Sequence, residues 1–269
     1  MSLYFLGNCQ TNALKAIAKD VCRVPVAGAS ITEFWGSYTP DESEAAMDAA
    51  EVIVAMAVMN PEHRFAAAKL RARWGAKVVF HPYIYVDGLS SLEKISSKGV
   101  GIIRGGEEIM AAAQWPAKVK LIEAYERGQI DMRQTERLNY SLARMAAAEA
   151  AYDGLRVTDY IRATYREMPL LYAINHPTQR VLFHMFDQLA ERLNLEVDAV
   201  KRADPVIWAR RALPPAQHSL TPQDVDVHGL AYGPSSHWWA QGARLIHSLV
   251  VRDAAAKAAA RKENRVDSL

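Results

Sequence analysis

A cysteine stands near the start of the chain, where a predicted strand turns into a predicted helix. Leu3–Leu6 is an apolar run that stops at Gly7, and from Thr11 the apolar residues follow helical spacing. This pattern places Cys9 at the carboxyl end of a strand and at a helix N-terminus. Unpaired N–H groups and the helix dipole stabilise a thiolate at such a position, although a small buried core cysteine is the alternative interpretation.

Amide side chains flank this cysteine on both sides. Asn8 and Gln10 can donate hydrogen bonds to an oxyanion that develops beside Cys9. Asn8 can also cap the helix that follows, and the two roles are compatible.

A histidine precedes a second predicted helix. His176 lies in the sequence Asn-His-Pro-Thr, and proline is favoured in the first turn of a helix, so His176 is expected at or next to the N-cap. The helix dipole there disfavours imidazolium and keeps the ring available as a general base. Arg180, one turn further on, would add a cation for a phosphate, with a solvated arginine as the alternative.

Another histidine, His81, follows the predicted buried strand 77–80. In a parallel sheet it would lie at the same edge as Cys9, where ligands of such sheets bind. A core histidine that is hydrogen-bonded to the backbone is the competing interpretation.

The elements that must position these residues predict an α/β fold. The run Val52–Val58 is a second buried strand, 22–26 is a possible further strand, and Glu62–Trp74 is a helix that Gly75 caps. Residues 1–106 are therefore expected to form an open, mostly parallel sheet, a Rossmann-like subdomain with helices on its faces.

The rest of the chain has helical character. Residues 107–253 are expected to be mainly helical, with helices over Thr158–Glu167 and Pro177–Leu195, and to pack against the sheet subdomain. The segment 211–234 is rich in proline and glycine and is predicted to be irregular. The tail 254–269 is predicted to be a solvated, fraying end.

Composition excludes several classes of protein. The 269 residues carry 32 Lys and Arg against 30 Asp and Glu, a net charge of +2, so no broad basic surface is available for nucleic acid. The longest apolar run, Val52–Met59, is far shorter than the roughly 20 residues of a transmembrane segment. Two cysteines indicate neither a disulfide framework nor a structural zinc site, and no metal is expected. Since the N-terminus lacks a secretory signal, we expect a cytoplasmic protein.

The three motifs together resemble a known family. The sequences Leu-Gly-Asn-Cys-Gln at 6–10, Phe-His-Pro-Tyr-Ile-Tyr at 80–85 and Asn-His-Pro-Thr at 175–178 are similar to those of the WcbI family of capsular-polysaccharide biosynthesis proteins. The resemblance implies an α/β subdomain embraced by helices. It also implies a bacterial, acetyl-CoA-dependent O-acetyltransferase whose partners are acetyl-CoA and a sugar of a surface-polysaccharide precursor. The residues that we expect to bind coenzyme A are Gly7, Thr11, Thr178 and Arg180.

The resemblance leaves two routes for acyl transfer open. In the first, His176 or His81 removes the proton of the sugar hydroxyl as it attacks the thioester, while Asn8, Gln10 and backbone N–H groups stabilise the oxyanion. In the second, Cys9 takes the acetyl group covalently and then passes it on.

Two other functions compete with acyl transfer. The sequence around Cys9 looks like the nucleophile position of SGNH-type esterases with cysteine in place of serine, but the late Asp-x-x-His of those enzymes is missing, because Asp226 and His228 have the wrong spacing. The other alternative is a non-catalytic subunit of a polysaccharide assembly complex that binds coenzyme A or a nucleotide.

Overall fold

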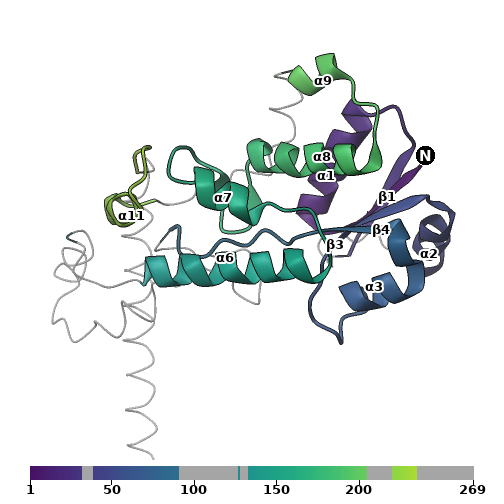
Figure 1. Ribbon diagram of the computed structural model, residues 1–269, viewed down its shortest axis with the longest axis horizontal. Helices are drawn as coiled ribbons and strands as arrows, with labels where there is room; N and C mark the ends of the chain where they lie inside the picture. Colours follow the sequence, from purple (N-terminus) through teal and green to yellow (C-terminus); the bar gives the residue numbers. More distant parts are fainter. Residues whose placement is uncertain (32–38, 91–126, 128–132, 205–219, 235–269) are drawn as a thin grey trace, which may run out of the picture. The chain divides into compact units, whose positions relative to one another are not determined.

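The computed structural model describes residues 1–31, 39–90, 127, 133–204 and 220–234 (Figure 1). The chain divides into two compact units, one formed by Met1–Val86 and Tyr140–Ala216, the other by Asp87–Asn139 and Gln217–Leu269. The predicted subdomain boundary at 106 and the tail 254–269 lie outside the described residues, so these two expectations stay predictions.

A four-stranded parallel sheet organises the first unit and confirms the predicted α/β class. Its strands run in the order β2-β1-β3-β4, and every neighbouring pair is parallel. All five residues of β1 are buried, as the continuous apolar run predicts for a strand covered on both faces. The strands are β1 (Leu3–Gly7), β2 (Val26–Ser30), β3 (Val52–Met56) and β4 (Val78–His81).

The strand expected over 22–26 is wrong in its position. Helix α1 (Cys9–Val21) extends up to Cys22, whose N–H is still bonded to the carbonyl of Ala18. The chain therefore joins the sheet only at Val26. Cys22 instead forms an isolated antiparallel bridge with Val197.

Helices cover both faces of this sheet. Figure 1 shows α1 and α8 (Gln179–Leu193) on one face, with α2 (Pro40–Ala49) and α3 (Ala67–Trp74) on the other. The core under α2 and α3 is formed by alternate strand residues with Met47 and Leu70. The helix expected from Glu62 begins only at Ala67, whose N–H is bonded to the carbonyl of Val58, but it ends at Gly75 as predicted, with φ +56°.

The connections of this sheet create a binding position. Strands β1 and β3 are neighbours at its centre, and the chain leaves β1 towards α1 on one face and β3 towards α3 on the other. Ligands of open α/β sheets bind at the carboxyl ends of such a pair of strands. Cys9 follows the carboxyl end of β1.

The other elements are mostly helical, as expected for the later part of the chain. The predicted helix at Pro177 begins two residues later, at Gln179. The segment 211–234 is not irregular throughout, because Thr221 and Asp224 form a capping box that starts a helix. None of the described helices combines the length and the apolar character needed to cross a membrane. These elements are η2 (Gly75–Lys77), α6 (Gln134–Ala151), α7 (Thr158–Thr164), β5 (Leu171–Ala173), β6 (His176–Pro177), α9 (Ala199–Ala203) and α11 (Pro222–His228).

Candidate functional site

The turn from β1 into α1 needs both a glycine and a capping residue. A Cβ at Gly7 would lie 1.9 Å from Oγ1 of Thr11, so a larger residue cannot enter without moving that side chain. Asn8 is the N-cap, and its Oδ1 accepts a hydrogen bond of 2.9 Å from the N–H of Gln10. Helix α1 therefore begins at Cys9 with the predicted cap in place.

Gln10 ties the three sequence motifs together. Its side chain is fully buried, and Nε2 donates to the carbonyls of Ile84 and Asn175, both at 2.8 Å. Its Oε1 accepts from the N–H of Ile84 at 3.0 Å. Because both N–H groups of the amide are already used, the expected role of Gln10 as an oxyanion donor is replaced by a positioning role.

His81 ends β4 at the same edge of the sheet as Cys9, and its ring is part of the core. The ring is fully buried, with Nδ1 2.9 Å from the carbonyl of Pro82 and Nε2 2.8 Å from Oγ1 of Thr11. Since a carbonyl can only accept, Nδ1 carries the proton and Nε2 accepts from Thr11. Burial lowers the pKa of His81 to about 4. The ring is thus held neutral, which favours the core interpretation over the catalytic one.

Cys9 is half-buried at the start of α1. Burial raises the pKa of the Cys9 thiol, although the backbone N–H groups of Gln10 and of Cys9 itself act in the opposite direction. The expected thiolate is therefore not the resting form, because desolvation outweighs the helix N-terminus. Burial also raises the pKa of Tyr83, although the hydrogen bond with Asn175 acts in the opposite direction. The segment of Tyr83 lies against the start of α1, because Gln10 is bonded to both backbone groups of Ile84.

The third motif contacts Tyr83 through the turn between β5 and β6. The Nδ2 of Asn175 donates to the hydroxyl of Tyr83 at 3.3 Å. His176 is half-buried within β6, not at the helix N-cap, because Pro177 completes the strand pairing and Thr178 is the cap residue. Thr178 makes no capping bond with its side chain, and Arg180 is exposed in the first turn of α8.

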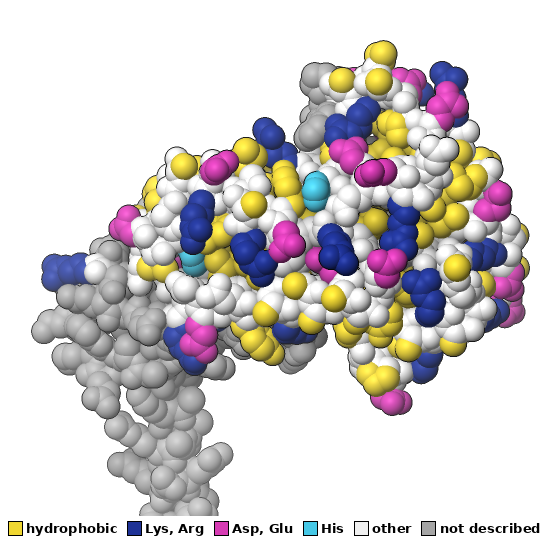
Figure 2. Space-filling view, in the orientation of Figure 1, with side chains coloured by type: hydrophobic (Ala, Val, Ile, Leu, Met, Phe, Trp, Pro, Cys, Tyr) yellow, Lys and Arg dark blue, Asp and Glu magenta, His cyan; other side chains and the backbone are white. Residues whose placement is uncertain are grey.

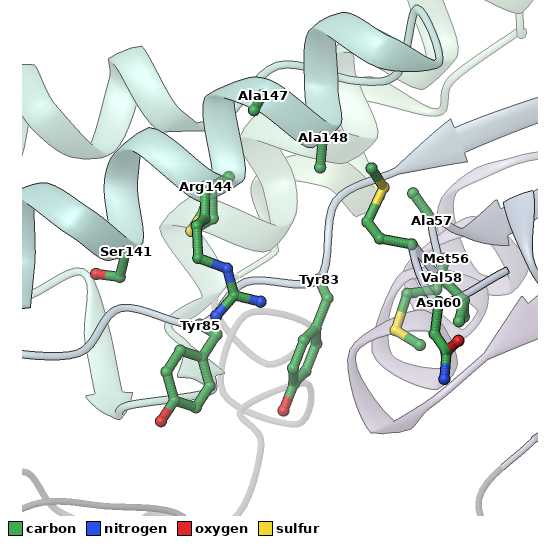
Figure 3. A pocket seen from close by; sticks show the side chains of 12 residues that line it. Met56, Ala57, Val58, Asn60, Tyr83, Tyr85, Ser141, Arg144, Ala147 and Ala148 are labelled. Carbon is green, nitrogen blue, oxygen red and sulfur yellow. The ribbon is translucent and has the colours of Figure 1, made fainter. Parts of the chain in front are cut away.

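A cavity of about 600 Å³ within the first unit is lined in part by Tyr83 (Figure 3). Its floor follows the carboxyl end of β3, Tyr83 and Tyr85 come from the segment after β4, and α6 forms the opposite wall. The volume lies in the usual range for small-molecule sites. The lining residues are Met56, Ala57, Val58, Met59, Asn60, Tyr83, Tyr85, Ser141, Arg144, Met145, Ala147 and Ala148.

The sequence did not point to Tyr83 or Arg144, which are among the polar residues that line this cavity. Tyr83 lies within a quoted motif, but only its place in the cavity lining and its bond with Asn175 indicate a role. Arg144 stands in an Ala-rich helical stretch with no local signal, and Figure 3 shows its guanidinium near Tyr83 and Tyr85.

Charges and metal ligands are dispersed. On the face seen in Figure 2, basic and acidic side chains are interspersed, so an anionic ligand there would be held by a few local cations. Within the described parts of the chain, no group of three or more His, Cys, Asp or Glu residues is arranged to hold a metal ion.

Comparisons with known proteins place this geometry in context. The model of the family described as "Polysaccharide biosynthesis enzyme WcbI" matches residues 108–198. A solved structure of WcbI is similar over 94% of this chain and 94% of its own, with a TM-score of 0.62 at 14% sequence identity. That structure is described as a novel polysaccharide biosynthesis enzyme, in its native form without a disulfide bond between coenzyme A and one of its cysteines. A comparison with curated proteins finds no match. The chain is thus similar over residues 108–198 to the WcbI family of polysaccharide biosynthesis enzymes, and it shares its fold with a WcbI structure.

Proposed function

We propose that the protein transfers an acetyl group from acetyl-CoA to a hydroxyl group of a sugar in a bacterial surface-polysaccharide precursor. The observation that carries the proposal is the position of Cys9 at the carboxyl edge of the sheet, where Gln10 binds the segment of Tyr83, which lines a cavity of ligand size. The description of the similar WcbI structure, which names coenzyme A and states that no disulfide bond links it to a cysteine there, supports the choice of acyl donor. Dependence on acetyl-CoA also agrees with the predicted cytoplasmic location.

The start of α1 can stabilise the charge that acyl transfer creates. The backbone N–H groups of Cys9 and Gln10 favour negative charge at the Cys9 sulfur, and they would act in the same sense on a thioester oxygen placed there. Asn8 can add its Nδ2, since its Oδ1 is used for the cap. The proposed oxyanion donors are therefore Asn8 and the backbone, without the Gln10 side chain.

His81 and His176 are not equally suited to act as the general base. Both ring nitrogens of His81 are engaged and its pKa is about 4, so this ring is a poor proton acceptor at neutral pH. We therefore assign the base to His176, which is half-buried next to Asn175. Gly7, Thr11, Thr178 and Arg180 remain the residues proposed to bind coenzyme A, with Gly7 and Thr11 acting through the shape of the turn.

The raised pKa of Cys9 favours direct transfer over a covalent acetyl-cysteine. In the direct route the sugar oxygen attacks the thioester carbon, and His176 takes the hydroxyl proton. The carbon–sulfur bond then breaks, and coenzyme A leaves as a thiolate that is protonated on release.

The test follows release of the coenzyme A thiol from acetyl-CoA in the presence of a panel of sugars. His176→Gln should lower the rate of release about 10²–10⁴-fold, the usual contribution of a general base. The matched control is His184→Gln, which changes a ring stacked on Tyr160. If acetyl-CoA neither binds nor loses its acetyl group with any acceptor, the proposal is wrong. Acetate release from acetylated sugars without coenzyme A would support the esterase alternative instead.

Mass spectrometry separates the two routes. Mixing the protein with acetyl-CoA alone should leave its mass unchanged if transfer is direct. An adduct of ~42 Da that disappears in Cys9→Ser but persists in Cys22→Ser would establish the covalent route.

A further inference from the structure

The pair Tyr83 and Asn175 offers one hydrogen-bond donor and one acceptor to a ligand. The hydroxyl oxygen of Tyr83 accepts from Nδ2 of Asn175 at 3.3 Å, so its own hydrogen points away from that amide and can be donated. The Asn175 side chain is only 7% exposed, and its Oδ1 has no hydrogen-bond partner among the described residues. A buried acceptor of this kind is costly unless a ligand satisfies it. A hydroxyl group, which both accepts and donates, matches the pair.

This pair lies at the thiol end of the site. Gln10, the residue after Cys9, binds the backbone carbonyl of Ile84, next to Tyr83, and that of Asn175, both at 2.8 Å. A hydroxyl group bound between Tyr83 and Asn175 would therefore lie close to Cys9, where the proposed reaction needs its acceptor oxygen.

The cavity extends from Tyr83 to a cation. Tyr83 and Tyr85 line it with ring centroids 6.1 Å apart, which provides a surface on which a pyranose ring can stack. Arg144 reaches into the same space from α6 (Figure 3). Its one interaction with a described residue is with the ring of Tyr140, 5.8 Å from the guanidinium carbon. Several other described arginines are bound to carboxylates, among them Arg133, Arg137, Arg162, Arg192 and Arg202.

We infer that the cavity is the acceptor-sugar site and that it selects a sugar bearing a carboxylate or phosphate, which Arg144 binds. The acceptor hydroxyl lies between Tyr83 and Asn175, the sugar ring stacks on the tyrosines, and the anionic group pairs with the guanidinium. This inference rests on the proposed acetyl transfer and names the substrate class of the same site.

Calorimetry at low salt tests the inference with three probes: methyl glucoside, methyl glucuronide and glucosyl phosphate. The two anionic sugars should bind about tenfold more tightly than the neutral one, as one charge-assisted contact provides. Tighter binding of the glucuronide alone indicates a carboxylate acceptor, and tighter binding of the phosphate alone indicates a phosphorylated one. Either result supports the inference.

Variants assign the effect to individual residues. Arg144→Leu should remove the preference for anionic sugars and leave the affinity for methyl glucoside unchanged, whereas Arg162→Leu, which changes an exposed arginine of α7, should keep the preference. Tyr83→Phe should weaken all three sugars by a similar factor, because it removes the hydroxyl donor.

Acetyl-CoA, titrated into the same variants, separates failure of this inference from failure of the proposed function. The inference is supported if acetyl-CoA binds the wild type and binds Arg144→Leu with the same affinity. If acetyl-CoA binds but the three sugars bind equally, the assignment of the cavity is wrong and acetyl transfer stands. A loss of acetyl-CoA affinity in Arg144→Leu would also overturn it, because the cavity would then belong to the donor. If acetyl-CoA does not bind the wild type, both proposals fall.

Discussion

Replacing Gln10 with leucine should destabilise the protein strongly, because this side chain joins three separate segments of the chain. Leucine has a similar size but leaves two carbonyls, of Ile84 and Asn175, and the N–H of Ile84 without their partner. Each buried polar group left unsatisfied costs about 1–3 kcal/mol, so the free energy of unfolding should fall by about 3–5 kcal/mol after some relaxation. That is a large part of the roughly 5–15 kcal/mol that stabilises most proteins.

A second glutamine provides a matched control. Gln188 bridges both backbone groups of Arg156 in the same way, with bonds of 2.7 and 2.8 Å, but its partners are exposed to water. Gln188→Leu should therefore cost only about 0.5–1.5 kcal/mol. Urea unfolding, followed by circular dichroism, measures both changes. Equal stability of the two variants would refute the reasoning, and a stable but inactive Gln10→Leu protein would restore Gln10 as a catalytic donor.

Three further predictions concern stability. The pKa of about 4 for His81 lies below its ordinary value of 6.5, so the unfolded chain binds more protons than the folded one between these pH values. The contribution of the neutral ring to the free energy of unfolding is present above pH 6.5, and that free energy should fall by about 2 kcal/mol by pH 5. Unfolding curves of His81→Gln should not show this pH dependence. Gly7→Ala should cost about 1–3 kcal/mol because the new Cβ meets Thr11, whereas Gly233→Ala, with open space around it, should leave the urea midpoint within error of the wild type. Glu149→Leu should lower stability by about 2–4 kcal/mol, since Glu149 Oε1 accepts three hydrogen bonds at the start of α7; an unchanged midpoint would show that these donors find water instead.

The sheet and the start of α1 were predictable because their signals are local. Short apolar runs followed by Gly7 and Gly75 indicate strands and helix ends, and Asn8 caps α1 as its residue type suggests. The position of Cys9 at the carboxyl edge follows from these local signals and from the parallel order of the strands.

The partners of the site residues were not predictable, because they come from distant parts of the chain. Nothing near Gln10 shows that its amide is occupied by segments 74 and 165 residues away. The thiol of Cys9 illustrates a balance of two effects, since the helix N-terminus is visible in sequence but the desolvation that outweighs it depends on packing. His176 was misplaced for a similar reason: the pairing of β5 with β6 overrides the helix-start signal of Pro177.

Protection of Cys9 from alkylation tests the central claim most directly, with Cys22 in the same molecule as the internal control. Iodoacetamide should react slowly with both thiols at neutral pH, since burial raises the pKa of Cys9 and raises that of Cys22 to about 11. If Cys9 lies at the acetyl-CoA site, saturating acetyl-CoA should slow its alkylation about tenfold or more and leave the rate at Cys22 unchanged. Alkylation of Cys9 at the same rate with and without acetyl-CoA would contradict the account.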